Sequence, residues 1–182
     1  MATGTTIYRA IIQLADADRG VYTELRATLA RHPSETAERL VVRLLAYALF
    51  YEPGLVFTKG ISDGDQPDLW VTDLDNRIAL WLEVGLPDVA RIAKACRRAA
   101  RVVLLLSGQR RRHWEGMHLP SLAGETNLSI WTLEQAVIQQ LVDALERSVK
   151  WALTVSGGVA YLTVGDRSME TPLICLQESS SV

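Results

Sequence analysis

The chain has 182 residues, of which 48% are hydrophobic and 22% are charged, and its formal net charge is −2. This length suits one globular domain with a substantial core, and the composition is that of an ordinary soluble protein. The near-neutral charge excludes the overall basic surface of a dedicated nucleic-acid binder, so any such binding needs a local patch.

Membrane insertion and secretion signals are absent from the sequence. No stretch reaches about 18 consecutive apolar residues, and the N-terminus has no basic segment followed by an apolar core. We therefore expect a cytoplasmic protein that does not contact a membrane. Cys96 and Cys175 lie far apart in the chain, and we expect buried free thiols rather than a disulfide.

The first 51 residues contain three predicted elements. Residues 4–15 are rich in Thr, Ile and Tyr and predict a strand. In residues 21–30 the spacing of four apolar positions predicts a short amphipathic helix: Val21, Leu25, Thr28 and Leu29. A stronger helix is predicted over residues 34–51, with Ser34 as its cap and with Glu35 and Glu38 near the positive end of its dipole.

A short strand is predicted over residues 55–58, and an acidic loop over residues 62–66 follows it. Asp63 and Asp65 of this loop can lend an outer-shell metal ligand, although two acids in a glycine-containing loop are more often simply solvated.

Residues 66–85 predict two antiparallel strands joined by a tight turn at Asp75 and Asn76. Paired residue numbers then sum to 151, which sets the following residues opposite each other: Asp68 and Glu83, Leu69 and Leu82, Trp70 and Trp81, Val71 and Leu80, Thr72 and Ala79, Asp73 and Ile78. Side chains alternate between the two faces along a strand, and opposed Cβ atoms lie roughly 5 Å apart.

The predicted register places the carboxylates of Asp68 and Glu83 side by side. Carboxylates this close must share a proton, gain a cationic partner or hold a metal. Magnesium suits the pair, because it takes hard oxygen ligands and is commonly held by one or two carboxylates. The alternative is that both acids lie at a solvated strand end and have no chemical role.

Pro87 favours a helix that continues to about residue 100, and residues 101–107 predict a buried parallel strand. The apolar stripe of this helix is predicted at five positions: Val89, Ile92, Ala93, Cys96 and Ala100. Arg91, Lys94 and Arg98 then project from roughly the opposite side.

The remaining chain predicts a strand at residues 127–132, a helix at 133–147 and antiparallel strands at 151–155, 159–164 and 169–176. We expect one domain over residues 1–176 and a disordered tail over 177–182. The C-terminal hairpin either extends the main sheet or pairs with the N-terminal strand. Three arginines at 110–112 can contact phosphates, but a solvated helix start is the more frequent use of such a run.

Pro67 and Asp68 on one strand, and Glu83, Val84 and Gly85 at the end of the next, resemble the PD-(D/E)XK signature of restriction-endonuclease-like nucleases. The chain is identified as a member of the YaeQ family, a divergent branch of that superfamily, by four stretches: LARHPSETAERLVVRLLAY, FTKGISDGDQPDLW, LWLEVGLPDVARIAKAC and NLSIW. The resemblance implies a mixed α/β fold, with a restriction-endonuclease-like core sheet, flanking helices and a C-terminal antiparallel extension.

The resemblance also implies roles for individual residues. Asp68 and Glu83 would hold magnesium, and an acid from the first core helix would assist, with Glu38 the first candidate and Glu35 the second. The family pattern has a lysine where this chain has Gly85. Lys94 on the following helix is the implied substitute, with Arg91 behind it, and a solvated basic face is the alternative for both.

Three functions remain open on this basis. The first is magnesium-dependent hydrolysis of nucleic acid, with Arg91, Lys94 and Arg98 as the nucleic-acid-binding residues. The second is a catalytically inactive nuclease-fold protein that binds a nucleic acid or a protein partner, which the replacement by Gly85 favours. The third is a self-association surface formed by the basic stripe and the tryptophans.

Overall fold

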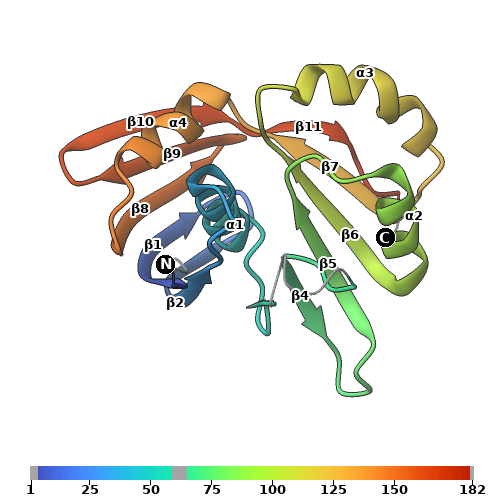
Figure 1. Cartoon of the computed structure of the whole chain (residues 1–182), viewed down its shortest axis with the longest axis horizontal. Helices are drawn as coiled ribbons and strands as arrows, with labels where there is room; N and C mark the ends of the chain where they lie inside the picture. The colour runs from blue at the N-terminus through green and yellow to red at the C-terminus, as the bar shows by residue number, and fades with distance from the viewer. Residues whose placement is uncertain (1–3, 59–64, 181–182) are drawn as a thin grey trace. The chain divides into compact units, whose positions relative to one another are not determined.

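The computed structural model describes residues 4–58 and 65–180, which fall into two compact units. Unit 1 comprises residues 1–48 and 133–173, and unit 2 comprises residues 49–132 and 174–182. Each unit contains one mixed sheet, and the described residues form four helices in all (Figure 1). The predicted mixed α/β fold is therefore confirmed, while the expectation of a single domain over residues 1–176 stays a prediction.

Unit 1 contains a five-stranded sheet in the order β10-β9-β8-β1-β2. Its strands are β1 (Thr6–Asp16), β2 (Val21–Arg31), β8 (Ser148–Ser156), β9 (Val159–Val164) and β10 (Arg167–Pro172). β1 is antiparallel to β2 and parallel to β8. The predicted C-terminal hairpin is thus confirmed, and it pairs with the N-terminal strand, which was one of its two predicted positions. The single strand predicted over residues 169–176 is wrong, because it divides at Leu173 into β10 and a strand of the other sheet.

The helix predicted over residues 21–30 is wrong, because these residues form β2. Leu25 and Leu29 are 3% and 2% exposed and are four positions apart, a spacing that fits one face of a strand as well as one face of a helix. Pairing of all 11 residues of β2 with β1 decides the outcome. β-branched residues such as Val21, Thr23 and Thr28 also favour a strand.

Two helices belong to unit 1 in whole or in large part: α1 (Ala37–Leu49), whose last residue lies in unit 2, and α4 (Gln135–Asp143). The side chains of α1 from Leu40 to Leu49 are almost all buried. α1 starts three residues later than the cap predicted at Ser34. Thr36 is the residue that caps it, since its Oγ1 accepts a hydrogen bond from the backbone N–H of Arg39 at 3.1 Å.

Unit 2 contains a six-stranded sheet in the order β11-β7-β6-β5-β4-β3. Its strands are β3 (Val56–Phe57), β4 (Leu69–Thr72), β5 (Ile78–Val84), β6 (Ala99–Leu106), β7 (Leu128–Thr132) and β11 (Ile174–Gln177). β5, β6 and β7 are parallel to one another, as the buried run at residues 101–107 predicted. β4 and β5 form the predicted hairpin at one side of this parallel core.

The helices of unit 2 are α2 (Val89–Arg98) and α3 (Arg111–Leu122). Ile92 and Ala95 of α2 pack into a core with Trp81 and with Trp114 of α3, whose indole N–H donates to the backbone oxygen of Pro87 at 3.0 Å. Ala95 was absent from the predicted stripe. Ala100 was wrongly included, because α2 ends at Arg98 and Ala100 lies exposed in β6.

Both cysteines are free thiols, as predicted. Cys96 is half-buried, and burial, followed by the charge of Glu125, raises the pKa of its thiol to about 12. Cys175 is exposed, so the prediction that it is buried is wrong. Its strand, β11, lies at the edge of the sheet beside β7.

Two residues of the tail predicted to be disordered, Gln177 and Ser180, form hydrogen bonds. Gln177 belongs to β11, and its side-chain amide donates to the backbone oxygens of Leu122 and Glu125 at 3.1 and 3.2 Å. The backbone N–H of Ser180 donates to the oxygen of Thr126 at 2.8 Å.

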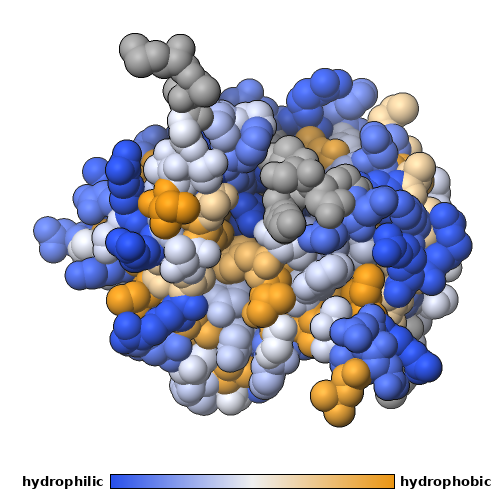
Figure 2. Space-filling model, turned by 60° about the horizontal axis from the view of Figure 1, so that its bottom comes forward, coloured by the Kyte–Doolittle hydropathy of each residue, from blue (hydrophilic) through white to orange (hydrophobic). Residues whose placement is uncertain are grey.

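None of the described helices is long and apolar enough to cross a membrane. The face drawn in Figure 2 has apolar residues interspersed with polar ones. The large apolar side chains that are exposed come from several elements and loops: Ile7, Tyr22, Val56, Leu74, Met117, Tyr161 and Ile174. The expected cytoplasmic location stays a prediction.

Candidate functional site

The hairpin that carries the two predicted acids has the predicted register in its inner part. Leu69 pairs with Leu82, Trp70 with Trp81, and Val71 with Leu80. A bulge after Val71 then pairs Thr72 with Ile78, so the predicted partners Ala79 for Thr72 and Ile78 for Asp73 are wrong. The turn needs the extra length because the Asp73 carboxylate accepts the backbone N–H groups of Asp75 and Arg77.

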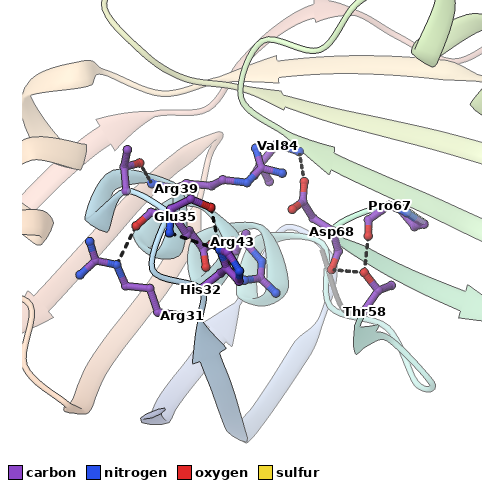
Figure 3. Close-up of polar contacts among 11 residues, drawn as sticks. Arg31, His32, Glu35, Arg39, Arg43, Thr58, Pro67, Asp68 and Val84 are labelled. Carbon is purple, nitrogen blue, oxygen red and sulfur yellow. Dashed lines mark hydrogen bonds and ion pairs between the residues drawn. The ribbon is translucent and has the colours of Figure 1, made fainter. Parts of the chain in front are cut away.

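Asp68 lies directly before β4 and is only 1% exposed. Its backbone N–H donates to the oxygen of Leu82 at 3.1 Å, and its carboxylate Oδ2 accepts the backbone N–H of Val84 at 2.9 Å. Figure 3 shows this carboxylate directed at Val84. Asp68 is therefore hydrogen-bonded to Leu82 and Val84, the chain neighbours of Glu83, which agrees with the predicted juxtaposition of the two acids.

Glu83 is 6% exposed near the end of β5. Oε1 accepts a hydrogen bond from Arg91 Nε at 2.9 Å, and Oε2 accepts one from Trp81 Nε1 at 3.0 Å. Burial, followed by the charge of Asp68, raises the pKa of Glu83, while both hydrogen bonds act in the opposite direction. The repulsion expected between the two carboxylates is therefore present, and a cation beside them relieves it.

The cation beside Glu83 is Arg91. Its side chain is 29% exposed, and its Nη2 also donates to the backbone oxygen of Gln66 at 2.7 Å. The predicted outward projection of Arg91 is wrong, because the helix buries Ala95 rather than Ala100. Residues four apart lie on the same helix face, which places Arg91 beside Ala95 and next to the sheet.

Lys94 and Arg98 lie further from the acids and contact the chain at Asp65. Lys94 Nζ forms an ion pair with Asp65, and the exposed fractions of these two side chains are 47% and 74%. Arg98 donates to the backbone oxygen of Asp65 at 3.3 Å, and its guanidinium lies 5.7 Å from the centroid of the Trp81 ring. The predicted roles of these cations in catalysis and nucleic-acid binding stay predictions. Asp63 lies outside the described residues.

Gly85, which stands where the family pattern has a lysine, has a φ of 93°. Its backbone N–H donates to the oxygen of Leu105 at 3.0 Å, which joins it to β6. A side chain at a positive φ is strained, because its Cβ approaches the backbone too closely. This backbone conformation gives a physical reason for glycine rather than lysine at this position.

The two acids predicted to assist from the first core helix lie in unit 1. Glu35 precedes α1, is 3% exposed and forms a 3.0 Å ion pair with the buried Arg43 (Figure 3). Glu38 is half-buried in the first turn of α1. Arg31 also donates to the backbone oxygen of Glu35 at 2.8 Å. The ion pair with Arg43 engages Glu35 within unit 1, and the assisting roles predicted for Glu38 and Glu35 stay predictions.

The donor set of Asp68 and Glu83 fits a magnesium ion, which takes one or two carboxylates and completes its shell with water or phosphate oxygens. It does not fit a metal that needs several protein ligands, because the described residues contain no group of three or more His, Cys, Asp or Glu side chains that could hold one. A pocket of about 10 Å³ beside Glu83 is lined by Trp81, Arg91, Ile92 and Ala95 among others, room for roughly one water molecule.

Two buried hydrogen-bonding residues, one in each unit, were missed from the sequence. Trp81 donates to Glu83, which its position two residues earlier on the same strand face could have indicated. Arg43 is buried on α1 beside the predicted apolar stripe, and no pattern in the sequence distinguishes it from a surface arginine.

Comparison with known proteins extends over almost the whole chain. The family model described as YaeQ protein matches residues 1–173. A YaeQ protein of Salmonella typhi is 38% identical over 181 residues, covering 99% of this chain and 100% of its own, and that of Escherichia coli K12 is 36% identical with the same coverage.

Solved YaeQ structures have the same fold as this chain. The crystal structure of the YaeQ protein from Pseudomonas syringae has a TM-score of 0.92 at 40% identity and covers 99% of this chain and 100% of its own. That from Xanthomonas axonopodis pv. citri also has a TM-score of 0.92, at 35% identity, and covers 96% of this chain and 99% of its own. The chain therefore belongs to the YaeQ family.

Proposed function

We propose that this protein hydrolyses phosphodiester bonds in nucleic acid with a magnesium ion bound by Asp68 and Glu83. The observation that supports this function is the buried pair of carboxylates on neighbouring strands of unit 2. Burying two carboxylates beside each other is costly, and Glu83 has a cationic partner in Arg91. The pKa of Glu83 is raised, and shifted pKa values of acids beside a like charge are common at functional sites.

The ion would polarise the scissile phosphate and supply a water nucleophile at neutral pH. Asp68 is oriented for this role by the Val84 N–H, and Glu83 by Trp81. Arg91 contributes the positive charge beside the acids that the family pattern assigns to a lysine, and its contact with Glu83 makes it a better candidate than Lys94. Arg91 donates a hydrogen bond to Glu83. With an ion bound, Arg91 would either keep this hydrogen bond or donate to the phosphate instead.

The experiment has two measurements on the same purified proteins: wild type, Asp68→Asn and Glu83→Gln. Manganese binding is followed by loss of the free-ion paramagnetic signal, since manganese prefers the same oxygen ligands as magnesium. Hydrolysis is followed on single-stranded DNA, duplex DNA and RNA with added magnesium. We expect both variants to lose manganese binding and cleavage together.

Two variants serve as matched controls, Asp75→Asn and Glu134→Gln, which remove exposed carboxylates and should leave both measurements unchanged. Equal hydrolysis by wild type and Glu83→Gln in matched preparations would assign the activity to a contaminant. Failure of the wild type to bind manganese, with or without an oligonucleotide, would overturn the metal site.

A second function is favoured by a specific observation at the same residues. Both oxygens of Glu83 accept hydrogen bonds from protein donors, and the lysine position is Gly85. An acid pair neutralised in this way supports a nuclease-fold protein that binds nucleic acid or a protein without cleaving. Nucleic-acid binding by wild type, with no cleavage of any of the three substrates and no manganese binding, would favour this function.

A further inference from the structure

The five-stranded sheet of unit 1 has one buried face and one exposed face. On β1, Tyr8, Ala10 and Ile12 are buried while the residues between them are half or fully exposed, and β8 alternates in the same way. The strands β2, β1, β8, β9 and β10 lie side by side (Figure 1). We call the exposed side, formed by every second residue of these strands, the open face.

Positive charge gathers at one end of the open face. Ile11 of β1 pairs with Arg26 of β2 on one side and with Lys150 of β8 on the other, and Arg9 lies two residues from Ile11 on the same face. Neighbouring strands are about 4.8 Å apart and two residues span about 6.8 Å. The backbones that carry these three cations therefore lie within an area of about 10 by 7 Å, close to the spacing of successive phosphates in a nucleic-acid strand.

Most of the cations at this end of the sheet do not form an ion pair with an acid among the described residues. Within residues 4–58 and 65–180, the side chains of Arg9, Arg147 and Lys150 form no ion pair, whereas Arg26 pairs with Glu24. Arg147 directly precedes β8, and its backbone oxygen accepts the N–H of Arg9 at 2.8 Å, which joins it to the group. We call Arg9, Arg26 and Lys150 the basic group; Arg147 borders it, because its place before β8 follows the alternation of the buried Val149 and Trp151. The chain as a whole has a net charge of −2, so this concentration of positive charge is local.

Arg9 and Arg147 also line an open depression of about 580 Å³. The hydroxyl-bearing residues Thr5, Thr6 and Ser148 share this lining. Guanidinium and hydroxyl groups are the side chains that most often bind phosphate oxygens, and arginine adds a bidentate geometry.

Exposed aromatic side chains lie on the same face. Tyr22 is 67% exposed and pairs with Ala15, whose other neighbour, Thr154, pairs with Tyr161, which is 43% exposed. This row crosses the sheet four residues, or about 13 Å, from the row of Ile11. Between the two rows lie the uncharged Gln13, Ala152 and Thr163, besides Glu24 at the edge.

We propose that the open face binds single-stranded nucleic acid, with the basic group on the phosphates and Tyr22 and Tyr161 stacked on bases. A positively charged surface combined with exposed aromatic rings is the arrangement by which proteins bind single strands without reading sequence. The inference does not rest on the acid pair of unit 2, because binding at the open face needs neither a metal nor hydrolysis. Glu83→Gln should therefore bind as well as wild type does.

The test measures fluorescence anisotropy of a labelled oligothymidylate of about 20 nucleotides, which exceeds the site of one binding face. The variant Arg9→Gln/Lys150→Gln should weaken binding at least about tenfold. It should also reduce the slope of log affinity against log salt by about 1.4, since each phosphate contact on a single strand contributes about 0.7. Tyr161→Ala should weaken binding about tenfold and Tyr161→Phe should not, because stacking uses the ring.

The matched control is Arg97→Gln/Arg112→Gln, which removes two exposed arginines from unit 2 and should leave affinity and slope unchanged. Circular dichroism establishes that each variant is folded. Equal weakening by the control and the test variant would mean that the binding depends on overall charge, and would overturn the proposal. Tighter binding to a duplex of equal length, or to phosphatidylserine vesicles, would overturn the assignment to single strands, as would the absence of oligothymidylate binding at low salt.

Discussion

At the scale of single residues, the ionisation of Glu83 affects the stability of the fold. Glu83 is almost fully buried, and Arg91 and Trp81 each donate a hydrogen bond to it. Burial and the charge of Asp68 nevertheless raise its pKa above the ordinary value of 4.5. The two stabilising bonds thus offset only part of the cost of placing a second negative charge beside Asp68.

Because the pKa of Glu83 is raised in the folded protein, the free energy of unfolding depends on pH in a definite direction. A carboxyl whose pKa is raised in the folded state favours folding fully below its unfolded pKa, and that contribution is lost as the pH rises through the raised value. In Glu83→Gln this loss should disappear, because the amide does not ionise. We expect the free energy of unfolding of Glu83→Gln, relative to wild type, to increase from pH 4.5 towards pH 8 in denaturant titrations without added metal.

Glu134→Gln provides the control, since it removes an exposed carboxyl and should show no such trend. A relative stability of Glu83→Gln that falls with pH would mean that ionised Glu83 stabilises the fold, contrary to the raised pKa.

The acid pair was predictable from the sequence and its cation was not. The strand period of two fixes which residues share a face once the register is known, and three residue pairs held the register. Arg91 instead depends on how α2 is rotated against the sheet. The rotation is set by packing of Ala95 with Trp81 and Trp114, residues that come from other elements.

At the scale of elements, the β4–β5 hairpin shows how a turn can change a register. Asn76 has a φ of 58° and is the one non-glycine residue at positive φ among those that the structure describes. Its backbone N–H donates to Asp73 at 3.1 Å, and the bulge beside Thr72 absorbs the extra residue. A left-handed conformation is tolerated by asparagine and glycine but costs other residues about 1 to 2 kcal/mol.

Asn76→Ala should therefore lower the free energy of unfolding by about 1 kcal/mol, whereas Asn76→Gly should change it little. Chemical denaturation of the two variants measures the difference. The neighbouring variant Asp75→Ala controls for the loss of a polar side chain, because Asp75 does not have a positive φ. Similar stability of the alanine and glycine variants would show that the turn changes conformation when Asn76 is replaced.

The helix predicted over residues 21–30 was wrong because the local pattern of apolar residues does not distinguish a helix from a strand there. Leu25 and Leu29 fit both periods, and the deciding contacts come from pairing with β1. By contrast, β5, α2 and β6 were predicted because an apolar strand, a helix introduced by Pro87 and a second apolar strand follow one another directly.

At the scale of the whole molecule, unit 1 is assembled from both ends of the chain. β8 pairs with β1 in a parallel contact that joins residues about 140 positions apart, as Arg9 and Ser148 show, and β9 and β10 follow β8 in the sheet. No local pattern predicts such a pairing, so the sequence left open whether the C-terminal hairpin joined the N-terminal strand or the main sheet. Unit 2 is mostly one continuous segment, and its topology was correspondingly easier to predict.

This arrangement predicts the behaviour of a shortened protein. A fragment of residues 1–132 lacks α4 and β8 to β11, so β1 loses its partner strand β8 and β7 loses its partner strand β11. We expect the fragment to aggregate or to lose cooperative unfolding, because an unpaired apolar strand edge is an aggregation site. Thermal unfolding and sedimentation compare it with the full chain. A soluble fragment with a cooperative transition attributable to β1 and β2 would contradict this expectation.

The parallel pairing of β1 with β8 also has a consequence for synthesis in the cell. Ribosomes add roughly 5 to 20 residues per second, so about 7 to 30 s separate the emergence of β1 from that of β8. Throughout this interval the β1–β2 hairpin exposes the edge that β8 later occupies. An exposed strand edge is a template for pairing with another chain, so we expect association of growing chains during this interval to take place at β1.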